Sequence, residues 1–152
     1  MSAITDQFNC ERIMIAILAL QADLVALNAA GGIVHEDAAT ETSAGTIDRI
    51  VVTGAPRTVF SYGKNMATPV MFSVILTVTI HLASNSPTTL DTYLAAIQAA
   101  NAAGAAPAGI VTLATSLFGA RGFDMFNVES GERSNGENER TASIQWECRF
   151  GA

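Results

Sequence analysis

The chain has little positive charge. Only 8 of its 152 residues are Lys or Arg, against 14 Asp and Glu, which leaves a formal net charge of −6. The basic residues stand singly along the sequence, whereas proteins that grip nucleic-acid phosphates gather them on one stripe or face. The sequence therefore argues against a DNA- or RNA-binding domain. Charged residues of both signs make up only 14%, against 49% hydrophobic, so we expect partners to cover part of the surface.

Cysteine and long apolar runs are also scarce. Cys10 and Cys148 are the only cysteines; they lack zinc-site spacing, and we expect two reduced, packed thiols. The apolar run from Ile13 to Leu20 is far shorter than the roughly 20 residues of a membrane span. Asp6 and Glu11 precede it, where a signal peptide would be basic. We therefore expect a protein made in the cytoplasm with no membrane segment.

The motifs of the common enzyme classes are missing. The sequence contains no phosphate-binding loop, dinucleotide fingerprint, His-Glu-x-x-His or Gly-x-Ser-x-Gly. His35, Glu36 and Asp37 are adjacent, and neighbouring side chains on a strand point to opposite faces, so these three cannot converge on one substrate. We interpret them as a solvated acidic edge, and His81 as a surface histidine on the polar side of a strand. We predict no enzyme activity, no metal and no cofactor.

Periodicity predicts where helices and strands lie. Apolar residues spaced by three and four predict a helix from about Asp6 to Asn28, ended by Gly31 and Gly32. Ser86 and Pro87 are typical of the start of a second helix. Alternating or apolar stretches predict strands, beginning with a short one at Ile33 and continuing over 47–53, 57–62, 70–82, 123–128 and 141–150.

Two stretches are less regular. The Ala-rich residues that begin at Ala95 are expected to end the second helix and form a linker to Gly109, and residues 110–118 fit either a helix or a strand. The whole order predicts one domain, residues 1–152, of the α+β class. We expect an antiparallel or mixed sheet with two main helices packed mostly on one face and a long terminal hairpin. Trp146, on the apolar side of the last strand, is predicted to be a core residue.

Two surfaces are candidates for contacts with partners. The first helix carries, beside its main stripe, a second apolar stripe of Met14, Leu18 and Val25, and one sheet can cover only one stripe. The segment Glu129–Glu139 is rich in Gly, Ser, Asn and Glu and is predicted to be an exposed loop that orders on assembly. Its candidate contact residues are Glu129, Glu132, Arg133, Glu137 and Glu139. A calcium site there is the alternative, but the ordered aspartate spacing of a calcium loop is missing.

Five features together carry a resemblance to a known family. They are the opening helix ended by Gly31 and Gly32, the turn Gly54-Ala55-Pro56-Arg57, the long strand Val70–Leu82, the helix start Ser86-Pro87-Thr88-Thr89-Leu90-Asp91, and the last alternating strand to Phe150. Their order, over nearly the whole chain, resembles that of the tail terminator proteins of long-tailed bacteriophages. The resemblance is one of arrangement and includes no signature motif.

The resemblance implies a structural virion protein without catalytic residues. Such proteins form a ring, usually of six copies, that caps the tail tube and joins it to the head–tail connector. The implied partners are further copies, the tail tube protein and a connector or stopper protein, with DNA passing through the ring without specific binding. Glu36, Asp37 and Glu41 are the acidic candidates to face that channel, where they would repel DNA. The alternatives are another neck, head-completion or tail-completion protein, a small ligand-binding domain, or a cytosolic chaperone or adaptor.

Overall fold

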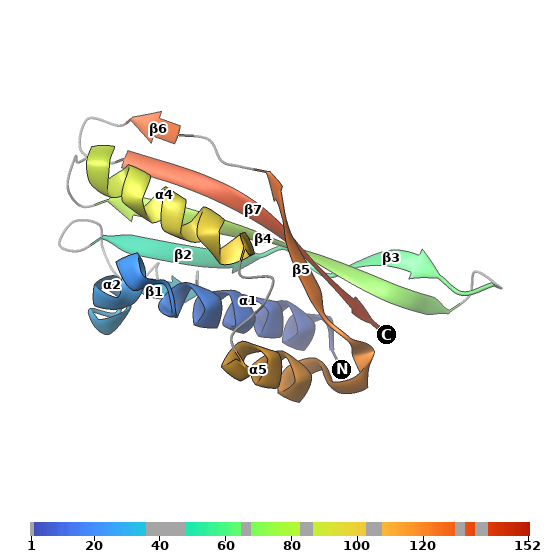
Figure 1. Cartoon of the computed structure of the whole chain (residues 1–152). Coiled ribbons are helices and arrows are strands. Elements are labelled where there is room, and N and C mark those ends of the chain that lie inside the picture. The colour runs from blue at the N-terminus through green and yellow to red at the C-terminus, as the bar shows by residue number, and fades with distance from the viewer. Residues whose placement is uncertain are drawn as a thin grey trace.

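The computed structural model describes residues 2–35, 48–64, 68–82, 87–102, 108–129, 133–135 and 140–152. The helices are α1 (Ala3–Ala19), η1 (Ala22–Leu24), α2 (Val25–Ala29), α4 (Pro87–Ala102), α5 (Ala108–Phe118) and η2 (Gly119–Arg121). The strands are β1 (Ile33–His35), β2 (Arg49–Gly54), β3 (Thr58–Tyr62), β4 (Pro69–Leu82), β5 (Asp124–Glu129), β6 (Arg133–Asn135) and β7 (Arg140–Gly151). Within these ranges the strands form one sheet, and the main helices lie against it (Figure 1).

The sheet is mixed, with β4 and β7 at its centre. Its order is β1-β2-β4-β7-β5, and β3 and β6 pair with further stretches of β4 and β7. The β1–β2 pair is parallel and the remaining pairs are antiparallel. The long pairing of β7 with β5 and β6 forms the terminal hairpin. The predicted α+β class and its mixed sheet are therefore confirmed.

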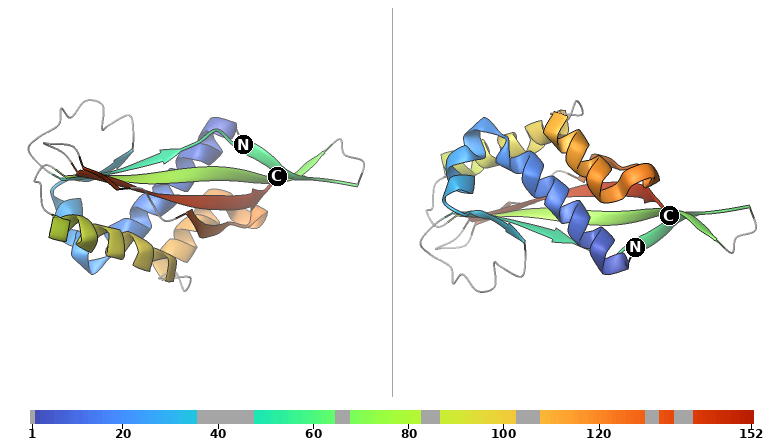
Figure 2. Two further views of the ribbon diagram at one scale, coloured as in Figure 1. Left: turned by 90° about the horizontal axis from the view of Figure 1, so that it is seen from above. Right: turned by 90° about the horizontal axis from the view of Figure 1, so that it is seen from below.

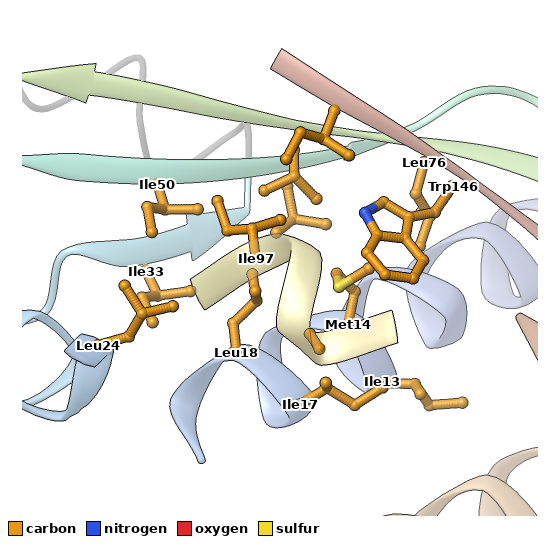
Figure 3. Packing of buried hydrophobic residues seen from close by; sticks show 14 of the residues in the cluster. Ile13, Met14, Ile17, Leu18, Leu24, Ile33, Ile50, Leu76, Ile97 and Trp146 are labelled. Atoms are coloured by element: carbon orange, nitrogen blue, oxygen red, sulfur yellow. The ribbon is translucent and has the colours of Figure 1, made fainter. Parts of the chain in front are cut away.

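Alternation along the central strands produces the core. Val74, Leu76, Val78, Ile80 and Leu82 of β4 are buried, and the first four pair in register with buried apolar residues of β7. They join one cluster with buried residues of α1, α4 and α5, so these helices cover the same face. Figure 2 shows these helices and the sheet from above and from below, and Figure 3 shows Trp146 among the core side chains near Met14 and Leu76. The predictions that Trp146 is a core residue and that both cysteines are packed free thiols are confirmed.

The prediction that Met14 and Leu18 contact another subunit was wrong. Both side chains are fully buried in the subunit's own core, whereas Val25 remains 54% exposed. The reason is that α1 packs against α4 and α5 as well as against the sheet. A second helical layer therefore covers the stripe that the sheet leaves open. The helix is also shorter than predicted, because the chain becomes extended at Gln21 before η1 and α2 begin.

Three other expectations change in detail. Helix α4 runs to Ala102, and its Ala96 and Ala100 are buried, so half of the expected linker is helix that packs on the core. Residues 110–118, which fitted either structure, belong to helix α5. Part of the expected loop is a strand, because β6 pairs with β7 from Arg133, opposite Ala142. Composition predicts a polar surface there, and a polar composition does not exclude backbone pairing at a sheet edge.

Candidate functional site: a projecting hairpin arm

Strands β3 and β4 form an arm that extends beyond the rest of the sheet. Strand β4 is 14 residues long. Its second half pairs with β2 on one side, its first half pairs with β3 on that same side, and β7 flanks it on the other side only as far as Met71. Beyond that point the sheet is a two-stranded ribbon, which projects from the body in Figure 1. A backbone hydrogen bond of 2.8 Å from Gly63 to Thr68 closes its turn.

The arm exposes large apolar side chains. Val59, Phe60, Tyr62 and Val70 are 39–50% exposed. Tyr62 and Val70 lie where only β3 and β4 pair, whereas Val59 and Phe60 lie nearer the base, where β7 still flanks β4. Phe60 lies against Arg149, and Val59 pairs with Phe72, whose ring lies beside that of Phe150 in the core. An isolated two-stranded hairpin is marginally stable in water, and contiguous exposed apolar surface is typical of interaction sites. The arm therefore has the properties of a segment that binds another protein surface.

A buried ion-pair cluster fixes the base of the arm. The Asp6 carboxylate of α1 is fully buried and accepts hydrogen bonds from Arg121 at 2.7 and 2.8 Å and from Arg57 at 2.6 Å. Burial raises the pKa of Asp6, but the hydrogen bonds from Arg121 and Arg57 and their positive charges outweigh burial and hold that pKa below its ordinary value. Arg57 lies directly before β3 and also stacks on Phe72, 3.9 Å from the ring centre. Helix α1 thereby holds the residue from which the arm begins.

The other face of the arm is held by Arg149 of β7. Its guanidinium lies 3.9 Å from the ring centre of Phe60 and 4.7 Å from that of Phe126. Glu147 accepts hydrogen bonds of 3.2 Å from Arg149 and of 2.8 Å from Ser73. These contacts join β3, β4, β5 and β7 on the sheet face that the helices leave open. Because both faces are anchored at the base, we infer that the arm keeps a defined direction while its tip remains exposed.

A second exposed apolar surface lies where α1 turns into η1 and α2. We call residues Leu20–Ala26 the corner. Leu20 and Val25 are each 54% exposed there, with exposed Ala22, Asp23 and Ala26 around them, while Leu24 is buried in the core. The Gln21 side chain donates to the Ile17 carbonyl at 3.2 Å and caps the end of α1. In Figure 1 the corner and the tip of the arm lie at opposite ends of the molecule.

The remaining candidates from the sequence are only partly placed. Glu129 ends β5 and Arg133 begins β6, so these two lie on the terminal hairpin, where only their backbone is described. Glu36, Asp37, Glu41, Glu132, Glu137 and Glu139 lie outside the described residues, as does most of the stretch considered for calcium. Val25 is thus the one predicted contact residue whose side chain is described and exposed.

The two histidines and two cysteines occupy separate places. His35 is not solvated as predicted, because its Nδ1 lies 2.9 Å from Glu11 Oε1 and its ring stacks on Phe8. His81 is half-buried on β4. Burial and the neighbouring Cys10 thiol raise the pKa of Cys148 well above its ordinary value, which keeps that thiol protonated at neutral pH. Among the described residues, no three His, Cys, Asp or Glu side chains are placed to hold a metal ion.

Sequence inspection missed the arm, although a signal was present. The stretch Thr58-Val59-Phe60-Ser61-Tyr62 places apolar residues on both faces of one strand. An edge strand with only one face covered by helices would need apolar residues on that face alone.

No model of a known protein family matches the chain, and no curated protein matches it in sequence. Within the described residues, no helix is both long and apolar enough to cross a membrane.

Proposed function

We propose that this chain is a structural subunit of a long-tailed bacteriophage, and that its copies form a closed ring at the neck. The resemblance to tail terminators implies six copies in that ring. In this role the ring caps the tail tube and joins it to the head–tail connector. The partners are further copies of the chain, the tail tube protein and a connector or stopper protein. The protein is made in the host cytoplasm and ends in the virion, and it acts through contacts and not as an enzyme.

The observation that carries an assembly role is the arm. Val59, Phe60, Tyr62 and Val70 are exposed on a ribbon whose base is anchored on both faces. An apolar ribbon that is exposed to water does not stabilise a monomer. In a subunit that assembles, the same ribbon is a preformed contact surface, which loses little conformational entropy on binding. The order of helices and strands supports the more specific assignment to the tail neck, through its resemblance to tail terminators.

Charge supports the same assignment. A ring through which DNA passes must not bind the phosphates, and the net charge of −6 with singly placed basic residues suits that requirement. The same features fit poorly with a protein that must retain DNA. The alternative of another neck or completion protein shares these properties and differs in position within the particle.

The test is the state of the purified protein and its place in the particle. We expect light scattering to give the mass of a closed oligomer and electron microscopy to show a six-fold ring with a central channel. In virions, density for the chain is expected between the tail tube and the connector. A monomer, an open filament, or density outside the neck would contradict the proposal. A ring found elsewhere in the neck would favour the completion-protein alternative.

A further inference from the structure

The arm and the corner are two exposed apolar surfaces at opposite ends of one chain (Figure 1). Each contains two large apolar side chains that are about half exposed: Tyr62 and Val70 near the tip of the arm, and Leu20 and Val25 at the corner. Each also rests on a well-packed support, since the arm is anchored at its base and the corner is held by buried Leu24. Both surfaces are therefore preformed in the single subunit.

Their charges are complementary. Exposed Lys64 lies in the turn of the arm, two residues after Tyr62, and exposed Asp23 lies between Leu20 and Val25 in the sequence of the corner. The arm therefore presents an apolar surface with a cation at its end, and the corner presents an apolar surface with an anion at its centre. Opposite charges at the rim of an apolar contact set its orientation and suppress wrong partners.

We infer that the arm of one copy binds the corner of the next copy, with Tyr62 and Val70 against Leu20 and Val25 and with Lys64 beside Asp23. The inference deepens the proposed function, on which it rests, by naming the two surfaces that meet. A contact between different surfaces of identical chains is head-to-tail and closes into a ring when its rotation returns to the start. Because every copy has one arm and one corner, no surface of this pair is left over in a closed ring.

Two variants each disrupt one of the two surfaces. The arm variant carries Tyr62→Ser and Val70→Ser, and the corner variant carries Leu20→Ser and Val25→Ser. Each alone is expected to be monomeric at concentrations at which the unchanged chain assembles. An equimolar mixture should form a dimer of one copy of each and nothing larger, because only one intact arm can meet one intact corner. Light scattering, with a mass tag on one variant, measures both results.

The matched control is Val128→Ser. Val128 is 51% exposed, lies on β5 at another edge of the sheet and belongs to neither surface, so this variant should assemble like the unchanged chain. Far-ultraviolet circular dichroism must show that all variants are folded. If the mixed variants stay monomeric while the control assembles, or if either variant assembles alone, the pairing is wrong.

Exchanging the charges of Lys64 and Asp23 tests the same contact independently, in variants that fold. Lys64→Asp and Asp23→Lys should each weaken assembly by roughly tenfold in the dissociation constant, and the chain with both changes should recover to within about threefold. High salt should reduce these differences. Arg12→Asp, an equal change of charge at an exposed position of α1, should have little effect. Absence of recovery in the double variant overturns the contact between Lys64 and Asp23.

These outcomes are distinguishable from failure of the proposed function. If the mixture gives the dimer but the unchanged chain forms a filament or is absent from the neck, the pairing stands and the phage role fails. If the unchanged chain forms a neck ring but the mixture gives no dimer, the role stands and the pairing fails. A chain that stays monomeric at its highest soluble concentration overturns both.

Discussion

Strand β4 passes through two different environments. From Leu76 to His81 it lies between β2 and β7, and from Val74 to Leu82 every second side chain is buried. From Pro69 to Phe72 it forms one half of the arm, where Val70 is 47% exposed. The same strand therefore packs into the core in its second half and exposes apolar surface in its first. If the arm assembles as proposed, the part that folds and the part that assembles are adjacent in sequence.

The largest expected difference is between Leu18 of α1 and Leu20, which directly follows that helix. Leu18 is fully buried and Leu20 is 54% exposed. We expect Leu18→Ala to lower the free energy of unfolding by about 2 to 5 kcal/mol, because it removes packed atoms and leaves a cavity. Leu20→Ala should change it by no more than about 0.5 kcal/mol. Urea unfolding of the two variants measures the difference, and equal losses would contradict the assignment of Leu18 to the core.

The next effect concerns the carboxylate that joins the body to the arm. Asp6→Asn removes the negative charge and one of the two acceptor oxygens that face Arg57 and Arg121, and we expect a loss of about 2 to 4 kcal/mol at neutral pH. The lower part of the usual range applies because both guanidinium groups reach solvent, with side-chain exposures of 20% and 18%. Urea unfolding measures the loss. Asp23→Asn, an identical change at an exposed carboxylate, is the control and should have little effect on the stability of the monomer, measured at high dilution.

The same substitution, Asp6→Asn, tests how the Asp6 ion pairs contribute to stability at acidic pH. The pKa of Asp6 is lower in the folded chain than its ordinary value of 3.8. A lowered pKa means that the ion pairs stabilise the fold above that ordinary value and lose this contribution as the pH falls toward the folded-state pKa. The difference in unfolding free energy between the unchanged chain and Asp6→Asn should therefore narrow below about pH 4. A difference that stays constant with pH would show that the Asp6 charge contributes nothing.

A smaller and local effect is expected at the base of the arm. Arg57→Ala removes one ion pair of Asp6 and the stacking on Phe72, while Arg121 still holds the carboxylate. The arm should then open more often than the body. Hydrogen exchange of the β3 amides should become faster, with exchange in the centre of β7 unchanged. Equal acceleration in both strands would indicate general destabilisation and not release of the arm.

The regular parts of this fold follow from sequence patterns, and the parts that depend on distant contacts do not. Alternation placed β4 and β7 and the buried Trp146. Periodicity could not decide residues 110–118, because a short, almost wholly apolar stretch suits a buried helix and a buried strand equally. Two apolar stripes on α1 were visible, but the number of layers that cover them depends on where α4 and α5 pack.

The candidate site shows the same limit. Asp6 and Arg121 are 115 positions apart, and no local pattern indicates that they meet. The arm depends on how far β7 extends beside β4, which is a matter of register and not of composition. The sequence shows apolar residues on both faces of β3. Their exposure can be predicted only when the positions at which the neighbouring strands end are known.

The smallest expected effect on stability belongs to the tip of the arm. Tyr62 and Val70 are about half exposed and lie beyond the anchoring contacts of Arg57 and Arg149, so little packing is lost when they become serine. We expect the arm variant to unfold within about 0.5 kcal/mol of the unchanged chain when both are measured as monomers at high dilution. The concentration dependence of melting should differ more, because only a chain that assembles gains stability with concentration. If the arm variant were strongly destabilised as a monomer, the arm would be part of the folding core, and its exposed side chains would need another explanation than assembly.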